Sequence, residues 1–187
     1  MKTNAIITLL IAGAMGFTAC TNKVDEKTIA DINQFGTDWS ALGEKATNWS
    51  NELSQTTTQA KEFAVKTNEM ASTTAASKDE AMKTKVNEMA AKATADATNL
   101  ETMQNEWTSF KTTWDETSKQ FSDWKEKVTK GEIPAEQANK DLADFRTKMT
   151  DVQTRIDGWA TSYASVKTSY EQNMAMAGTI STPEAKK

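Results

Sequence analysis

One segment decides the fold: LETMQNEWTSFKTTWDETSKQFSDWKEKV, residues 100–128. Its large apolar residues recur at alternating gaps of three and four positions, and Thr117 is the one polar member of the series. This heptad spacing keeps one stripe of an α-helix turned toward a partner helix. The segment therefore predicts a long helix that packs against others along its length. The series consists of Leu100, Met103, Trp107, Phe110, Trp114, Phe121, Trp124 and Val128.

Two further segments, residues 32–70 and 138–170, carry the same stripe, and the central stripe extends back to Met82. Every Phe, Trp and Tyr after Cys20 lies on a stripe, whereas random placement would put about two residues in seven there. The sequence thus predicts an all-α fold, an elongated antiparallel three-helix bundle or coiled coil. We expect helices at about 28–71, 78–129 and 134–177, each reaching roughly 70 Å. The pattern resembles spectrin-like three-helix coiled coils in architecture alone.

Two breaks separate the predicted helices. Between Met70 and Met82 the first stripe loses its phase, and we expect the turn within residues 71–77. Ser77-Lys78-Asp79-Glu80 matches a capping box that starts a helix. No Gly or Pro marks this turn, so a bent continuous helix is the alternative. At the second break, Gly131 can adopt the left-handed conformation that closes a helix, and Pro134 can begin the next one.

The number of helices and the bounds of the bundle depend on two weaker stretches of sequence. A four-helix bundle would result if residues 54–58, the weakest part of the first stripe, formed a break. After residue 177, Gly178 and Pro183 frame a polar tail, so the bundle is expected to occupy residues 28–177 and residues 178–187 to be disordered.

The N-terminus is typical of a secretory signal. In residues 1–19, Lys2 supplies positive charge and an apolar run follows that is too short for a transmembrane helix. The signal ends in Phe17-Thr18-Ala19-Cys20. This tetrapeptide resembles the lipobox of bacterial lipoproteins, although Phe17 stands where Leu is usual. The resemblance implies that Cys20 carries a covalent diacylglyceryl and acyl lipid (palmitate or a similar chain), followed by a polar linker at residues 20–27.

The same resemblance implies where the protein resides. We expect a lipid-anchored protein of the bacterial cell envelope. Thr21 follows the lipidated Cys where Asp would imply inner-membrane retention, so a Gram-negative source would place the protein in the outer membrane facing the periplasm. The cell surface stays open as an alternative. The expected partners are the membrane, through the lipid, and an unidentified envelope protein.

Composition excludes several classes of function. Net charge is −4, which gives no basic surface for nucleic acid. Histidine is absent, and the single Cys permits neither an internal disulfide nor a Cys-cluster metal site. Serine has no His partner, and nothing brings the acidic pairs Asp115-Glu116 or Asp141 and Asp144 into a pocket. We therefore predict no enzyme, no catalytic or metal-binding residues, and no cofactor apart from the lipid.

Three features within the stripes carry further predictions. The six tryptophans could form a carbohydrate-stacking surface, but their heptad positions favour core packing. Asp96 occupies a stripe position: it belongs either to a core polar layer with Thr56, Lys167 and Tyr170, or to the wet edge with Ala97 inward. Gly36 and Gly43 each follow a stripe residue and could let a bulky side chain approach closely.

The sequence leaves the function open between two main hypotheses. The first is a structural or protein-interaction role for a lipid-anchored rod. The second is a periplasmic chaperone-like or apolar-ligand-binding lipoprotein, which would use the softer, Met- and Ala-rich end of the bundle opposite the anchor. Because aromatic side chains bury the most area, we expect the end near the anchor to be the more stable one.

Overall fold

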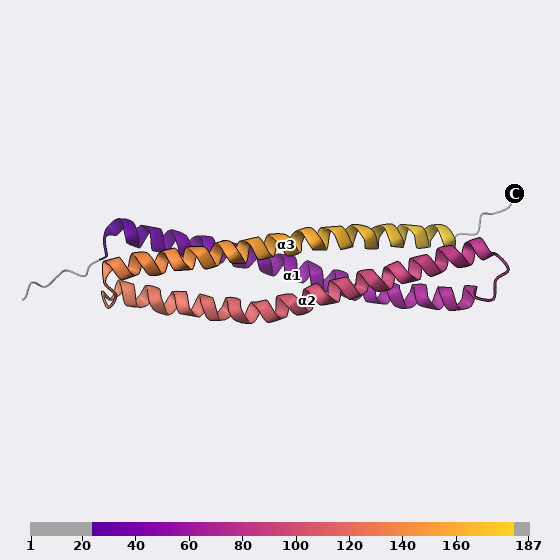
Figure 1. Cartoon of the computed structure of the whole chain (residues 1–187), viewed down its shortest axis with the longest axis horizontal. Coiled ribbons are helices and arrows are strands. Elements are labelled where there is room, and N and C mark those ends of the chain that lie inside the picture. Colours follow the sequence, from indigo (N-terminus) through magenta and orange to yellow (C-terminus); the bar gives the residue numbers. More distant parts are fainter. Residues whose placement is uncertain (1–23, 182–187) are drawn as a thin grey trace, which may run out of the picture.

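The computed structural model describes residues 24–181, which form three long α-helices (Figure 1): α1 (Glu26–Thr74), α2 (Glu80–Thr129) and α3 (Ala135–Ser181). No strand occurs within this range. The predicted all-α three-helix bundle is confirmed, and each helix begins and ends within about one turn of its predicted bounds.

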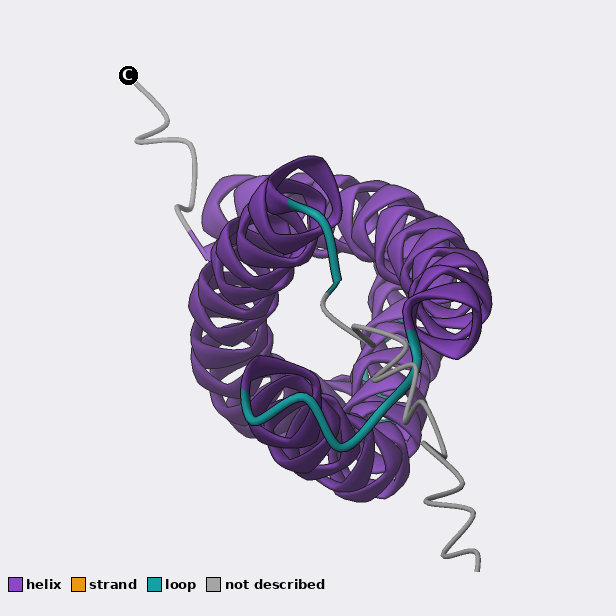
Figure 2. Cartoon of the chain, turned by 90° about the vertical axis from the view of Figure 1, so that its left-hand side faces the viewer, coloured by secondary structure: helices purple, strands orange, loops and turns teal. Residues whose placement is uncertain are grey.

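The helices are antiparallel to their chain neighbours and wind around a common axis (Figure 1 and Figure 2). One end of the rod, here called the proximal end, contains the start of α1 and the turn between α2 and α3. The other, the distal end, contains the turn between α1 and α2 and the end of α3. At a rise of 1.5 Å per residue, the rod is roughly 70 Å long.

The first turn spans residues 75–79, which excludes a bent continuous helix. Its cap differs from the prediction. The Asp79 carboxylate accepts a hydrogen bond from the Met82 N–H at 3.0 Å, and Ser77 Oγ accepts from the Asp79 N–H at 3.1 Å. Asp79 rather than Ser77 is thus the N-cap. A carboxylate at this position also interacts favourably with the positive end of the helix dipole.

The second turn follows the prediction. Gly131 has φ 74°, the left-handed conformation expected of it. Its N–H donates to the Val128 carbonyl at 3.0 Å, and the Glu132 N–H reaches the Lys127 carbonyl at 2.9 Å. The Pro134 carbonyl then accepts from the Ala138 N–H at 2.9 Å, so α3 begins directly after the proline.

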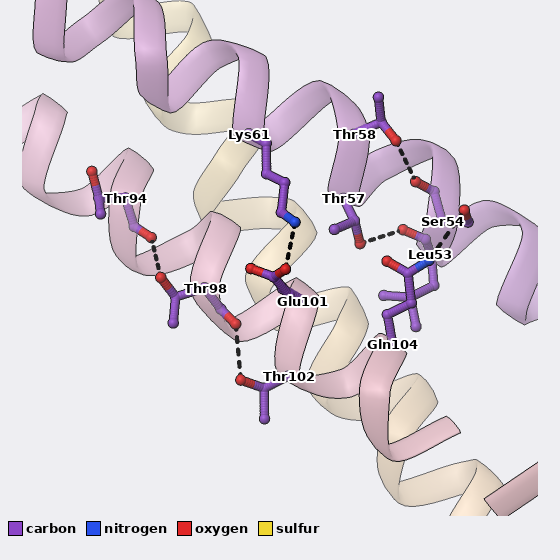
Figure 3. Close-up of polar contacts among 10 residues, drawn as sticks. All are labelled: Leu53, Ser54, Thr57, Thr58, Lys61, Thr94, Thr98, Glu101, Thr102 and Gln104. Carbon is purple, nitrogen blue, oxygen red and sulfur yellow. Dashed lines mark hydrogen bonds and ion pairs between the residues drawn. The ribbon is translucent and has the colours of Figure 1, made fainter. Parts of the chain in front are cut away.

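Residues 54–58 form no break, so the four-helix alternative is wrong. The Thr57 hydroxyl donates to the Leu53 carbonyl at 2.7 Å and the Thr58 hydroxyl to the Ser54 carbonyl at 3.1 Å (Figure 3). The run of three threonines stays helical despite its low propensity. Thr57 and Thr58 turn their hydroxyls back onto their own helix, whereas Thr56 bonds across to Tyr163 of α3.

The two ends of the bundle also differ from the expected bounds. Asp25 caps α1, so the polar linker ends before residue 26. Its hydrogen bond from the Thr28 N–H, at 2.6 Å, holds the pKa of the Asp25 carboxyl below its usual value. Residues 178–181 continue α3 instead of belonging to a disordered tail, because one glycine weakens a helix without ending it. The signal segment, Cys20 and residues 182–187 lie outside the described residues.

The core follows the predicted stripes closely. The proximal end holds a cluster of buried side chains from all three helices, here called the proximal aromatic cluster: Ile32, Phe35, Trp39, Phe121, Trp124, Val128, Ala138, Leu142 and Phe145. The side chains at the distal stripe positions are smaller. The prediction that Met82 belongs to the core is wrong, because this residue is 41% exposed at the start of α2. Within residues 24–181, no helix is long and apolar enough to cross a membrane.

Candidate functional site

Asp96 is buried in the distal half of the bundle, with 6% of its surface exposed. Its Oδ2 accepts hydrogen bonds from Ser169 Oγ at 3.0 Å and from Asn173 Nδ2 at 2.8 Å. Ala97 is buried as well, at 7% exposed, so the prediction of Asp96 at the wet edge is wrong. Two donors from α3 compensate the carboxylate for the water that it loses.

The predicted partners of Asp96 lie in a different arrangement. Thr56 Oγ1 and the Tyr163 hydroxyl share a hydrogen bond of 2.8 Å, and the Lys167 ammonium lies 5.8 Å from the centre of the Tyr163 ring. Tyr170 packs edge-on against Phe63, and burial, followed by the charges of Glu62 and Glu171, raises its pKa.

The structure therefore contains two separate polar contacts where the sequence predicts a single polar layer. Asp96 bonds to α3 and Thr56 to Tyr163, about two helical turns apart along α3. Sequence reasoning missed Ser169 and Asn173. The heptad pattern could have identified Asn173, because this residue lies three positions beyond Tyr170, at the next position of the same stripe.

The tryptophans divide into two groups. Trp39, Trp49 and Trp124 are buried, as core packing predicts, whereas Trp107, Trp114 and Trp159 are only partly buried. The stripes therefore correctly place the tryptophans on the faces where the helices pack, but they overstate how fully Trp107, Trp114 and Trp159 are buried. These partly exposed rings line two grooves near the middle of the rod.

The first groove lies between α1 and α2 and has a volume of about 650 Å³. Its floor contains Trp39 and Trp114, which stack with ring centres 4.1 Å apart and planes inclined by 8°. A Cβ atom built on Gly43 would come within 3.0 Å of the Trp114 ring, so the close approach suggested for Gly43 occurs. Gly36 faces Phe121 in a similar but looser way, at 3.4 Å.

The second groove lies between α2 and α3 and has a volume of about 700 Å³. Phe110 and Trp159 form its floor, edge to face, with centres 5.2 Å apart. The Trp159 indole N–H donates to Glu106 Oε2 at 2.9 Å. The Arg155 guanidinium lies over both rings, 5.4 Å from the centre of Phe110 and 5.9 Å from that of Trp159.

One member of each acidic pair considered for chemistry has a structural partner. Asp115 pairs with Lys111 at 2.6 Å. Asp141 accepts from the Trp124 indole N–H at 2.9 Å and from Gln137 at 2.6 Å, which ties α2 to α3 at the proximal end. Among residues 24–181, no group of three or more acidic, His or Cys side chains is placed to hold a metal ion.

The chain matches no protein-family model, no curated protein and no solved structure. The class of protein is therefore defined by the fold itself: an elongated three-helix bundle. Its candidate functional surfaces are the two grooves with partly exposed tryptophans at mid-length.

Proposed function

We propose that this protein is a lipid-anchored rod of the bacterial cell envelope, with a structural or protein-interaction role and no catalytic activity. The observation that carries the proposal is the position of α1, which starts at Glu26, so that only residues 21–25 lie between Cys20 and the bundle. A lipid on Cys20 would hold the proximal end at the membrane. The rod could then extend roughly 70 Å from the membrane surface.

Attachment through Cys20 would be effectively permanent. Each buried methylene contributes about 0.8 kcal/mol, and the lipid implied by the lipobox has several acyl chains. The Thr at position 21 favours the outer membrane facing the periplasm in a Gram-negative cell. The net charge of −4 argues against nucleic acid as a partner.

The anchor is tested by cell fractionation of Cys20→Ser, with Thr18→Ser as the matched control that keeps the cysteine. We expect Cys20→Ser to move to the soluble fraction and to lose labelling by an alkyne-bearing fatty acid, while Thr18→Ser stays with the outer membrane. A Cys20→Ser protein that remains in the membrane fraction would overturn the anchor.

The interaction role is tested by photo-crosslinking in cells that express the anchored protein. A crosslinking amino acid is placed in turn at exposed positions along the three helices, including Thr47, Thr113 and Thr154. We expect one discrete heavier product from a contiguous set of positions. The absence of any product along the whole rod would contradict a protein-interaction role.

A chaperone-like or apolar-ligand-binding role is the second candidate, favoured by exposed side chains toward the distal end. Met82, Met174 and Met176 are 41%, 47% and 37% exposed. Methionine adapts its shape to varied apolar partners. If this role holds, an environment-sensitive apolar dye should bind the native protein, and Met82→Lys with Met174→Lys should abolish its fluorescence. A native protein that leaves the dye dark would exclude this candidate.

A further inference from the structure

We infer that the α2–α3 groove around Arg155 is the docking surface for a partner protein, and that it receives a carboxylate side chain flanked by an apolar one. The inference rests on the proposed interaction role and specifies which face of the rod performs it. Within residues 24–181, the groove leaves the charge of Arg155 unpaired, and it has an aromatic floor and a polar rim.

Arginine is rare in this chain, with two residues against twenty lysines. Both lie on α3. Arg146 pairs with Asp31 at 3.8 Å, whereas Arg155 forms no ion pair and its guanidinium no hydrogen bond within residues 24–181. A guanidinium that stacks on aromatic rings keeps its N–H edges free, and those edges fit a carboxylate through two parallel hydrogen bonds.

The floor of the groove is held in place before any partner arrives. The Phe110 and Trp159 rings meet at 77°, and the bond from Trp159 to Glu106 fixes the indole. A rigid aromatic surface loses little side-chain entropy on binding. Trp and Arg are also the residues that dominate binding energy at interfaces. The floor can therefore receive an apolar side chain next to the carboxylate that Arg155 binds.

The rim of the groove is formed by α2 and is polar. The Thr102 hydroxyl donates to the Thr98 carbonyl at 2.9 Å and the Ser109 hydroxyl to the Asn105 carbonyl at 3.1 Å. Because their protons are used within the helix, these hydroxyl oxygens, which belong to residues that line the groove, keep only the capacity to accept hydrogen bonds. They can accept N–H groups from a partner segment. A polar rim around an aromatic centre is the usual anatomy of a protein interface.

Glu106 determines where the partner's carboxylate can lie. It also lines the groove, and its Oε2 already accepts the Trp159 indole N–H. Its negative charge repels a second carboxylate, so the partner's acid must bind at the edge of Arg155 that faces away from Glu106. Glu106→Gln keeps an oxygen for the Trp159 N–H but removes the charge. This variant should therefore strengthen binding, by about threefold.

The test uses purified full-length protein and two capped peptides, acetyl-Leu-Glu-Leu-amide and acetyl-Leu-Gln-Leu-amide. Binding is followed by NMR through the indole N–H signal of Trp159, which is assigned with Trp159→Phe. We expect the Glu peptide to shift this signal to saturation and the Gln peptide to bind about tenfold more weakly. Arg155→Gln should lose the preference, whereas Arg146→Gln, the matched control, should keep it.

Several results would overturn the inference. These are equal binding of the two peptides, equal loss in Arg146→Gln and Arg155→Gln, or weaker binding in Glu106→Gln. Saturable binding of glucuronate without binding of the Glu peptide would assign the groove to an acidic saccharide instead. Failure here leaves the proposed function intact if crosslinks form elsewhere on the rod. The fractionation of Cys20→Ser tests the membrane anchor alone, and its outcome does not depend on peptide binding at the groove or on crosslinking along the rod.

Discussion

Gly43 lies against the ring of Trp114, so closely that a Cβ atom at Gly43 would come within 3.0 Å of Trp114 Cζ2. Trp114 is also stacked on Trp39, with ring centres 4.1 Å apart, so a shift of the Trp114 ring would disturb this stacking. The absence of one side chain on α1 thus permits the closest ring stacking in the described part of the bundle.

Gly43→Ala is expected to destabilise the bundle although alanine is the better helix former. The gain in helix propensity is about 1 kcal/mol, while overpacking against the stacked ring of Trp114 costs about 1–3 kcal/mol. We therefore expect a net loss of about 1 kcal/mol in the free energy of unfolding, measured by urea denaturation. Gly158→Ala is the control, because it meets no atom within 4 Å and should gain stability from propensity alone. A gain at both positions would contradict the close contact.

Asp96 and Asn173 are expected to be energetically coupled. Asp96→Leu alone leaves the Asn173 amide, which is 3% exposed, without its acceptor, and this should lower the free energy of unfolding by about 1–3 kcal/mol. Asp96→Leu with Asn173→Leu should recover that loss and raise the melting temperature. If the polar layer also fixes helix register, analytical ultracentrifugation of the double variant should reveal additional oligomers. If the double variant instead lost as much stability as the sum of the losses in Asp96→Leu and Asn173→Leu, the coupling would be excluded.

The three-helix fold could be predicted from the sequence because heptad spacing acts at short range and recurs along every helix. The turn at Gly131 was predictable for the same reason, since only local backbone conformation decides it. Asp79 was harder to identify as the cap, because Ser77 and Asp79 are both good capping residues and differ by only two positions.

Contacts between helices were less predictable than the helices themselves. Counting residues in antiparallel helices puts Asp96 beside Lys167 and Tyr170, but the observed partners are Ser169 and Asn173. The observed register of α3 against α2 is therefore offset by a few residues from simple counting, and periodicity alone does not specify this offset. Arg155 is a similar case: its place over Phe110 and Trp159 depends on how α2 and α3 face each other.

Tyr170 should make the bundle sensitive to alkaline pH. Burial and two nearby carboxylates raise the pKa of its phenol, so the unfolded chain ionises this group at a lower pH than the folded chain does. The stabilising contribution is therefore complete below about pH 10 and is lost as the pH rises through the higher folded pKa. In melting experiments between pH 9 and pH 11, Tyr170→Phe should lose less stability than the wild type does. Identical losses would show that other groups, such as the lysines, account for the alkaline sensitivity.

The distal end should open before the proximal end in native-state hydrogen exchange. The proximal aromatic cluster joins all three helices, with Phe35, Phe121 and Phe145 in mutual ring contact at centre distances of 4.7–6.0 Å. The distal end instead buries smaller or polar side chains such as Ala90 and Thr67, and leaves Met82 exposed. Since less apolar area is buried there, local opening costs less free energy. We expect amides near residues 70–90 to exchange fastest within the helices, with the slowest near residues 32–42 and 117–128. Phe121→Ala should weaken the proximal end and so narrow the difference in amide protection between the two ends. Equal protection along the wild-type rod would contradict the assignment of stability to the aromatic cluster.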